Sequence, residues 1–206
     1  MTTRAGRAAP AHYGSAAGEL AVCMTAVGLA ARSDLAVLAF TARRRSLDHL
    51  LTRVLGHGVA PNGVAVEGAA WWCRSAAGNE ILVIHPYAQG PRLGDALRRN
   101  VHRFTGAKLT DLSESRFVLS VLGRRTRDVL ADLGVKDASP FSSALLGGHR
   151  VDWLFARPTS AIGIVDAHEA AAVWKLVETA GRAHGISCVG LDSVERYALV
   201  GRSLRG

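Results

Sequence analysis

One order of predicted elements occurs twice in this chain, at a spacing of about 80 residues, and this repetition constrains the fold more than any other feature. The apolar run 37–40 is followed by an arginine-rich turn and an amphipathic stretch, and the run 118–121 has the same sequel. The run 81–86 precedes a second amphipathic stretch, and the run 161–166 repeats this pattern at the same spacing. Short apolar runs between turns predict strands, and apolar residues spaced three and four apart predict helices.

Each repeat also contains a predicted hairpin and ends in a short predicted strand. The runs 142–147 and 151–156 are separated by a glycine pair that favours a tight hairpin turn, and 63–75 can serve in the same way. The closing strands are predicted at 107–111 and 187–192. A lone half would expose the face that its partner covers. We therefore predict an α+β fold of two pseudo-symmetric halves, each of mainly antiparallel sheet with packed helices.

These halves define the expected domain organisation. Residues 1–17 are small, rich in Pro and Gly and without periodicity, which predicts a mobile N-terminal arm. Residues 18–206 are expected to form a single body, in which a helix at 18–31 leads into the first strand. The pseudo-repeats span about 32–111 and 112–192, and a C-terminal tail spans 193–206.

Composition excludes several classes of protein. The formal charge of +8 comes almost wholly from arginines scattered over separate turns and helices, which does not predict a nucleic-acid surface. A basic surface that docks on an acidic protein suits the same charge. The three cysteines lie far apart and show no metal-ligand spacing, which predicts reduced thiols, no metal and a cytoplasmic protein. No apolar stretch reaches the roughly 20 residues of a membrane span.

The junction between the repeats carries the most distinctive residues. In "LTDLSESRFVL" (109–119), Asp111 and Ser113 can accept hydrogen bonds from backbone amides in a tight crossover turn, and Arg116 can reach the carboxylate of Asp111 or Glu114. We expect these residues to hold the two halves together. In the following "LGRRTRD" turn, Arg124 is expected to face solvent or a partner.

Two further candidates each leave two interpretations open. Trp71 and Trp72 adjoin on a predicted strand, so their side chains point to opposite faces. Trp72 lies either at a partner interface or, with Trp71, in a partly buried core. His85 ends a predicted strand, and a structural hydrogen bond is favoured over a general base because no carboxylate partner can be assigned to it.

The segment "TDLSESRFVLSVLGRRTRDVLADLG" (110–134) resembles the aminomethyltransferase superfamily, which includes the T-protein of the glycine cleavage system. The order of "DLSESRFVLSVLG" (111–123), "WWCRSAAGNEILVIHP" (71–86) and "AAAVWKLVETAGRAHG" (170–185) is more similar to the gamma subunit of heterotetrameric sarcosine oxidase. The resemblance covers about residues 30–190. It implies a fold like the folate-binding domain of aminomethyltransferases.

The tail resembles the segment in which T-proteins place a folate-contacting glutamate. In that alignment Leu199 stands at the glutamate and Tyr197 at the arginine, and a leucine cannot accept the hydrogen bonds that a pterin donates. Glu195 and Arg196 lie nearby, so the three residues 195–197 form a candidate ligand pocket only in a shifted register. The T-protein's catalytic aspartate also has no counterpart, and we therefore predict no catalytic residue.

The resemblance implies a subunit role. We predict a small, non-catalytic subunit of a multi-subunit flavin amine oxidase, which braces the folate-binding part of a larger flavoprotein partner. This chain itself is expected to bind no cofactor, whereas FAD, FMN and tetrahydrofolate belong to the partner assembly. The alternatives are a shortened tetrahydrofolate-dependent one-carbon transferase, acting alone or with a second chain, and a stand-alone structural paralogue without folate.

Overall fold

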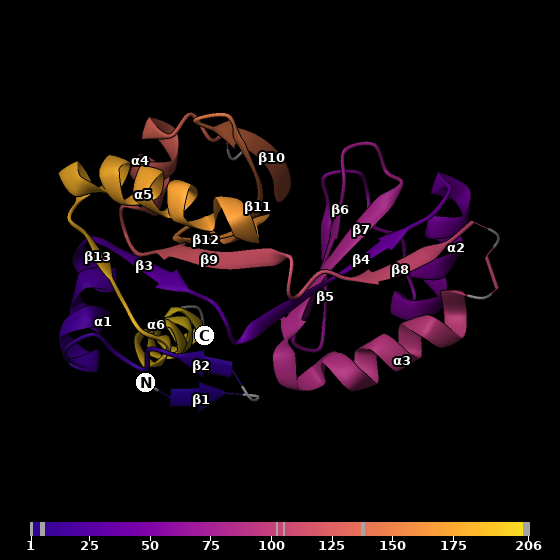
Figure 1. Ribbon diagram of the computed structural model, residues 1–206, viewed down its shortest axis with the longest axis horizontal. Coiled ribbons are helices and arrows are strands. Elements are labelled where there is room, and N and C mark those ends of the chain that lie inside the picture. Colours follow the sequence, from indigo (N-terminus) through magenta and orange to yellow (C-terminus); the bar gives the residue numbers. More distant parts are fainter. Residues whose placement is uncertain (1, 5–6, 102, 105, 137–138, 204–206) are drawn as a thin grey trace. The chain divides into compact units, whose positions relative to one another are not determined.

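The computed structural model describes residues 2–4, 7–101, 103–104, 106–136 and 139–203 (Figure 1). The chain divides into two compact units. We call Asp34–Arg116 with Ala138–Ser142 the first-repeat unit. The second-repeat unit comprises Met1–Ser33, Phe117–Asp137 and Ser143–Gly206.

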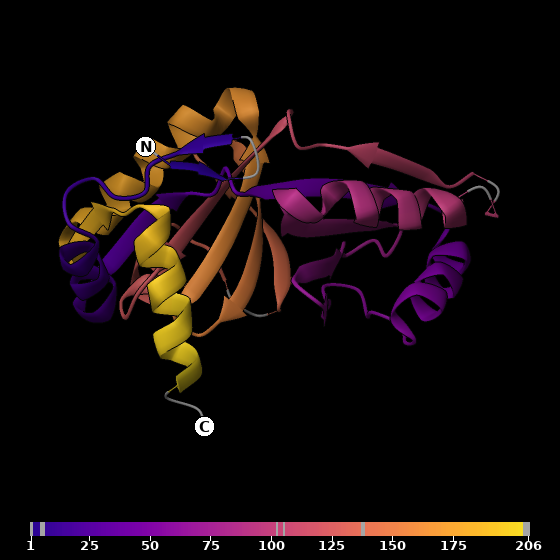
Figure 2. The same cartoon turned by 90° about the horizontal axis from the view of Figure 1, so that it is seen from below.

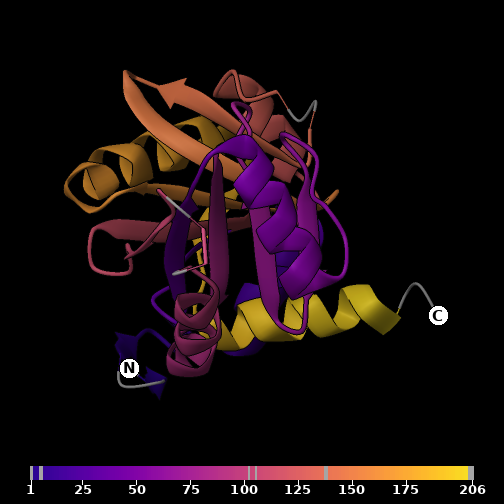
Figure 3. The ribbon, with the colours of Figure 1, turned by 90° about the vertical axis from the view of Figure 1, so that its right-hand side faces the viewer.

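The first-repeat unit is a five-stranded antiparallel sheet with helices on one face. Its strand order is β5-β6-β7-β4-β8, with β5 at Val64–Glu67, β6 at Ala70–Arg74, β7 at Glu80–Pro86, β4 at Leu35–Thr41 and β8 at Lys108–Asp111. Helix α2 (Arg44–Leu55) follows β4, while the short helix η1 (Tyr87–Gln89) and α3 (Gly90–Val101) follow β7. Helix α2 lies in front of the strands in Figure 3.

Burial of leucines explains why both helices lie on that face. Three leucines of α2 and Leu97 of α3 are fully buried against Phe40, Trp72 and the inward residues of β7. A fully buried leucine contributes about 1.5–3 kcal/mol relative to an exposed one, so this apolar stripe anchors the helices to the sheet.

The second-repeat unit is built on a six-stranded sheet. Its order is β10-β11-β12-β9-β3-β13, with β10 at Phe141–Leu146, β11 at His149–Arg157, β12 at Ser160–Asp166, β9 at Arg116–Leu122, β3 at Val27–Ala31 and β13 at Ile186–Cys188. Helix α4 spans Thr126–Asp132, and the short helix η2 (Ala167–Glu169), α5 (Ala170–Gly181) and the short helix η3 (Arg182–His184) follow β12. Strand β3 is antiparallel to β9 and parallel to β13.

Helices cover both faces of this second sheet. Side chains of α4 and α5 pack with Trp153 and Leu119 in one core. Helix α1 (Ala16–Thr25) contributes Cys23, and helix α6 (Leu191–Ser203) contributes Val194, to a separate cluster. This cluster also contains Ala30 of β3 and Leu122 of β9. Their neighbours along the strands, Leu29 and Val121, belong to the first core, so the two clusters lie on opposite faces of the sheet. The two helices lie side by side (Figure 2). The second-repeat unit therefore has three layers.

The predicted order of elements is confirmed in both repeats. Strand β9 corresponds to β4, and β12, η2 and α5 follow one another just as β7, η1 and α3 do. The two sheets also share their strand order, except that β3 stands between β9 and β13. Trp72 and Trp153 occupy equivalent sites, because Trp72 pairs with Val83 of β7 and Trp153 pairs with Gly163 of β12, the matching strand.

The predicted hairpins are also confirmed. Strands β5 and β6 are joined at Gly68, and β10 and β11 at Gly147 and Gly148, all three with positive φ. Such φ values are the ones that tight hairpin turns require and that glycine adopts without strain.

The helix predicted at 18–31 is wrong over its second half. Helix α1 ends at Thr25, and 27–31 form the buried strand β3. A short apolar run does not separate a buried strand from a helix, so tertiary packing decides. Gly28 permits that packing, because a Cβ there would lie 2.7 Å from the Cys23 Sγ and 2.8 Å from Val189.

The segment predicted as a mobile arm contains two short strands, β1 (Thr2–Arg4) and β2 (Arg7–Ala9). Ala9 is buried, and the amides of Leu191 and Asp192 donate to the carbonyls of Pro10 and Ala11. The predicted C-terminal tail forms most of helix α6. The mobility of the arm and the single body of 18–206 stay predictions. Within the described part of the chain, no helix is long and apolar enough to cross a membrane.

Candidate functional site

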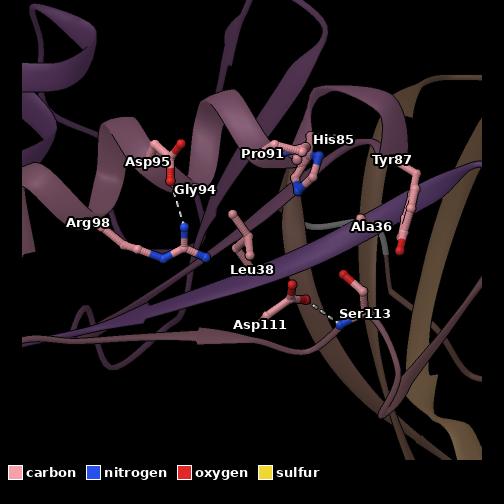
Figure 4. A pocket seen from close by; sticks show the side chains of 11 residues that line it. Ala36, Leu38, His85, Tyr87, Pro91, Gly94, Asp95, Arg98, Asp111 and Ser113 are labelled. Atoms are coloured by element: carbon pink, nitrogen blue, oxygen red, sulfur yellow. Dashed lines mark hydrogen bonds and ion pairs between the residues drawn. The ribbon is translucent and has the colours of Figure 1, made fainter. Parts of the chain in front are cut away.

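A pocket of about 320 Å³ lies within the first-repeat unit, on the face of its sheet that carries α3 (Figure 4). Strand β4, the end of β7, η1, α3 from Gly90 to Arg98, the end of β8 and the turn after it supply its walls. The lining residues are Ala36, Leu38, His85, Tyr87, Gly90, Pro91, Gly94, Asp95, Arg98, Asp111 and Ser113.

His85 is the most unusual residue of this pocket. Its side chain is 1% exposed, and its Nδ1 lies 2.9 Å from the carbonyl oxygen of Pro86. Because a carbonyl can only accept, Nδ1 carries the proton and donates. The Nε2 atom is buried and has no hydrogen-bond partner among the described residues. A buried polar atom without a partner costs about 1–3 kcal/mol.

The charged residues of the pocket are two carboxylates and one guanidinium. Arg98 Nη1 donates to Asp95 Oδ1 over 2.7 Å on the surface of α3, where both side chains are 62% exposed. Asp111 Oδ1 accepts from the Ser113 amide at 2.9 Å. The lining of the pocket thus carries two acidic groups and one basic group.

The turn after β8 is tied to β4. The amide of Val37 donates to the Ser113 Oγ at 3.2 Å, and the amide of Leu112 donates to the Val37 carbonyl at 2.9 Å. Asp111 stands opposite Leu38 in the register of β4 and β8. This local arrangement, an Asx-type turn, fixes the Asp111 carboxylate at the rim of the pocket.

Two glycines on α3 create the space. Gly90 and Gly94 stand one helical turn apart on the wall of the pocket. A Cβ at Gly90 would lie 3.2 Å from the His85 Cε1, and one at Gly94 would lie 3.6 Å from the Arg98 guanidinium.

Two solved structures resemble this chain along most of its length. One chain of heterotetrameric sarcosine oxidase from Corynebacterium sp. U-96 matches with a TM-score of 0.68 and 21% identity, over 88% of this chain and 97% of that one. The glycine cleavage aminomethyltransferase T from Bartonella henselae matches with a TM-score of 0.74 and 15% identity, over 93% of this chain and 56% of that one. This chain therefore spans little more than half of the T-protein. No protein-family model and no curated protein sequence matches it.

The chain has an aminomethyltransferase-type fold. The predicted fold class and the resemblance drawn from the sequence are thereby confirmed at the level of fold. At these identities the comparison reaches no further than the fold.

Within this aminomethyltransferase-type fold, the crossover residues lie in one turn of the first-repeat unit. Asp111 and Ser113 both line the pocket, and the Arg116 amide donates to the Leu112 carbonyl at 2.9 Å. Their predicted role between the halves stays a prediction. Arg124 is exposed in the second-repeat unit, where its amide donates to the Cys23 carbonyl at 3.2 Å, and its predicted contact with a partner stays a prediction.

Trp72 lies in the core of the first-repeat unit, with 1% exposure. The prediction of Trp72 at a contact surface is wrong, because so buried a side chain offers no surface to a partner. Strand alternation explains the outcome, since it places one tryptophan of the pair inward and leaves Trp71 half-buried on the other face.

The candidate pocket on the tail is not assembled by the fold. Glu195 and Arg196 are exposed on α6, whereas Tyr197 packs against the cluster around Cys23. None of the three lines the pocket beside His85. Consecutive residues of a helix point in different directions, so a shifted register cannot bring these side chains together.

Cys23 and Glu19 serve the structure of the second-repeat unit. Burial, with the nearby Glu19 charge, raises the pKa of Cys23 to about 12, which leaves a thiol and no nucleophile. Burial alone would raise the Glu19 pKa, but hydrogen bonds from the amides of Gly190, Tyr13 and Gly14 and from the Ser193 hydroxyl hold it below its ordinary value. Among the residues that the structure describes, no group of three or more His, Cys, Asp or Glu side chains could hold a metal ion.

Proposed function

We propose that this chain is a small, non-catalytic subunit of a hetero-oligomeric flavin amine oxidase of the sarcosine oxidase kind. The observation that carries the proposal is the match to one chain of a heterotetrameric sarcosine oxidase, which is aligned over 97% of its length. Because 88% of this chain takes part in that match, the two chains are of similar length.

The side chains support a bracing role more than catalysis. Cys23 is a buried thiol, and the His85 Nδ1 donates to a carbonyl instead of the carboxylate that orients a general base. Leu199, which stands where T-proteins place the folate-contacting glutamate, is 58% exposed. In this proposal FAD, FMN and tetrahydrofolate are bound by larger subunits, and this chain braces the folate-binding part of its partner.

Co-purification tests the subunit role. The untagged native chain is isolated from its own cells on a matrix-bound antibody, and the eluate is examined by size exclusion and flavin absorbance. A larger flavoprotein that co-elutes in fixed stoichiometry, with amine oxidase activity, is the expected result. A lone monomer without flavin would show that the subunit role is wrong.

The arginine turn offers a directed version of this test. Arg124 is exposed, so Arg124→Glu should leave the fold intact and weaken the complex by at least about tenfold in Kd if the turn faces an acidic partner. Arg53→Glu, at an exposed site of α2, is the matched control and should change the Kd less than about twofold. Equal losses in both variants would indicate only the effect of net charge.

The second candidate function is a shortened tetrahydrofolate-dependent one-carbon transferase. The T-protein match favours it, because 93% of this chain takes part at the higher TM-score of 0.74. Titration of the isolated chain with tetrahydrofolate in a calorimeter separates the two candidates. Saturable binding by this chain alone would favour the transferase, whereas heat indistinguishable from dilution is expected of the subunit.

A further inference from the structure

The pocket of the first-repeat unit has a filled counterpart in the second repeat. Phe117 is the second residue of β9, as Ala36 is of β4, and Trp174 is the fifth residue of α5, as Gly94 is of α3. The rings of Phe117 and Trp174 contact each other edge to face, with centroids 6.3 Å apart, and pack on the core of their unit. Where the second repeat has two aromatic rings, the first has a methyl group and a hydrogen atom.

The contacts of α3 do not require a glycine at position 94. A Cβ at Gly94 would meet no atom closer than 3.6 Å, so the backbone leaves room for a side chain there. Glycine inside a helix is also disfavoured relative to alanine, because it loses more conformational freedom on folding. The first repeat therefore keeps open a space that the same fold fills with an aromatic pair in the other repeat.

The Arg98 guanidinium forms a flat wall of this space. A Cβ at Gly94 would lie 3.6 Å from both Nη1 and Nη2 of Arg98 and 3.7 Å from its Cζ. Nearly equal distances to three atoms of one plane place that Cβ over the face of the guanidinium and not at its edge. Hydrogen bonds of a guanidinium, such as that from Nη1 to Asp95, leave its faces available for stacking. A planar cation of this kind stacks favourably on an aromatic ring.

The remaining walls suit the edges and faces of a ring. Ala36, Leu38 and Pro91 supply apolar surface, and Tyr87 supplies an aromatic side chain. The volume of about 320 Å³ lies at the lower end of the roughly 300–1,000 Å³ that pockets for small molecules span. The space thus suits one compact ring system.

We propose that this pocket binds a small molecule with a planar aromatic ring system of one or two fused rings, which stacks on the Arg98 guanidinium and packs on Leu38 and Pro91. The ring takes the place that Trp174 holds in the second repeat. The His85 Nε2 is buried, so no contact with the ligand is assigned to it. The proposal goes beyond the subunit role, because it rests on the pocket and the repeat alignment alone. No covalent step is involved.

Calorimetry and amide NMR of the full chain test the proposal with defined probes. Indole and benzyl alcohol are expected to bind saturably and to move the amide resonances of Gly90 and Gly94, because the ring current acts on nearby nuclei. Gly68, in the β5–β6 turn outside the pocket, is the remote reference and should not move. Cyclohexylmethanol, the non-planar counterpart of benzyl alcohol, should bind at least about threefold more weakly, since it cannot stack on the guanidinium.

Four results would overturn the proposal. Indole fails to bind, or cyclohexylmethanol binds as tightly as benzyl alcohol. The Gly68 resonance moves as much as that of Gly94, which would place binding elsewhere. N-acetyltryptophanamide, which carries peptide groups on its ring, binds more tightly than indole, which would show a site for a side chain of another protein.

Two variants locate the binding. Gly94→Trp combined with Ala36→Phe copies the aromatic pair of the second repeat into the first and should abolish indole binding, with folding checked by circular dichroism. Arg98→Lys does not depend on that repacking. It keeps a positive charge beside Asp95 but removes the planar group, so it should weaken benzyl alcohol about threefold or more and leave cyclohexylmethanol unchanged.

The matched control is Arg99→Lys, at the next residue of α3. Arg99 is exposed and does not line the pocket, so the Kd for benzyl alcohol should change less than about twofold. Undiminished affinity in Arg98→Lys, or an equal loss in both lysine variants, would mean that the guanidinium face does not hold the ring, and the proposal would be wrong.

Discussion

The first-repeat and second-repeat units share one strand order but differ in layers. In the first, β8 pairs directly with β4 and is antiparallel to it. In the second, β3 takes the place beside β9, and β13 pairs with β3 one position further out. Because β13 is parallel to β3 and β3 is antiparallel to β9, β13 keeps the direction that β8 has relative to β4. The repeat therefore tolerates an inserted strand without reversing any other.

The inserted strand brings a helical layer with it. Helices α1 and α6 cover Ala30 and Leu122 on the second face of that sheet, and Glu19 joins them by accepting from the Gly190 amide at 2.7 Å. On the face that carries α5, Phe117 and Trp174 fill the space that corresponds to the pocket of the first-repeat unit. One unit has been elaborated for packing, while the other keeps a cavity beside a buried histidine.

Replacement of the equivalent tryptophans should have the largest effect on stability. Trp72 and Trp153 are both almost fully buried in the cores of their units. Trp72→Ala and Trp153→Ala should each cost about 3–5 kcal/mol, because each leaves a large cavity. Urea unfolding followed by far-UV circular dichroism measures this cost. If one variant lowers the free energy of unfolding by less than about 1 kcal/mol, the two tryptophan sites are not equivalent in packing, and the proposed equivalence of the two cores is wrong.

Loss of the Glu19 charge should have an intermediate effect on stability, and this effect should arise in the second-repeat unit. Glu19 is 8% exposed and accepts four hydrogen bonds, so Glu19→Gln should cost about 1–3 kcal/mol at neutral pH. Its folded-state pKa is lowered, so its contribution is complete above the ordinary value of about 4.3 and is lost as the pH falls through the lower folded value.

Urea unfolding across this pH range checks the sign. The stability difference between the native chain and Glu19→Gln should shrink on acidification. A difference that grows toward acid would mean that the carboxyl is held neutral in the folded state. Glu178→Gln, on α5, is the matched control and should change the free energy of unfolding at neutral pH by less than about 0.5 kcal/mol.

Much of the fold could be predicted from the sequence because local signals agreed with the tertiary structure. Gly147 and Gly148 adopt the positive φ values that a tight hairpin turn requires, so this turn could be predicted from the two residues alone. The repeated order of strands along the sequence also agrees with the order of strands in the two sheets. Strand β3 could not be predicted, because its apolar residues suit a buried helix equally well. The inward position of Trp72 was also undetermined, since alternation separates the faces of a strand but does not say which face is the core.

The pocket escaped prediction for a different reason. The pocket is open because Gly90, Gly94 and Ala36 have no side chain or only a methyl group. Small residues do not predict a cavity by themselves, and they stand out only when the equivalent positions of the second repeat are compared. The signal was present in the repeat, where Trp174 stands at the position of Gly94. His85 was correctly interpreted as a residue with a structural hydrogen bond, but the sequence could not show that its second nitrogen lies buried and unpaired.

The smallest expected effect tests whether the open space is a structural need. A glycine within a helix costs about 0.5–1 kcal/mol relative to alanine, and a Cβ at Gly94 would make only an ordinary contact at 3.6 Å. Gly94→Ala should therefore raise the free energy of unfolding by about that amount. In Gly90→Ala the new Cβ would lie 3.2 Å from the His85 ring, so this control should gain less. Thermal and urea unfolding of both variants would measure the difference. If Gly94→Ala is instead destabilising, the glycine serves the packing of α3, and the cavity is a by-product of that packing.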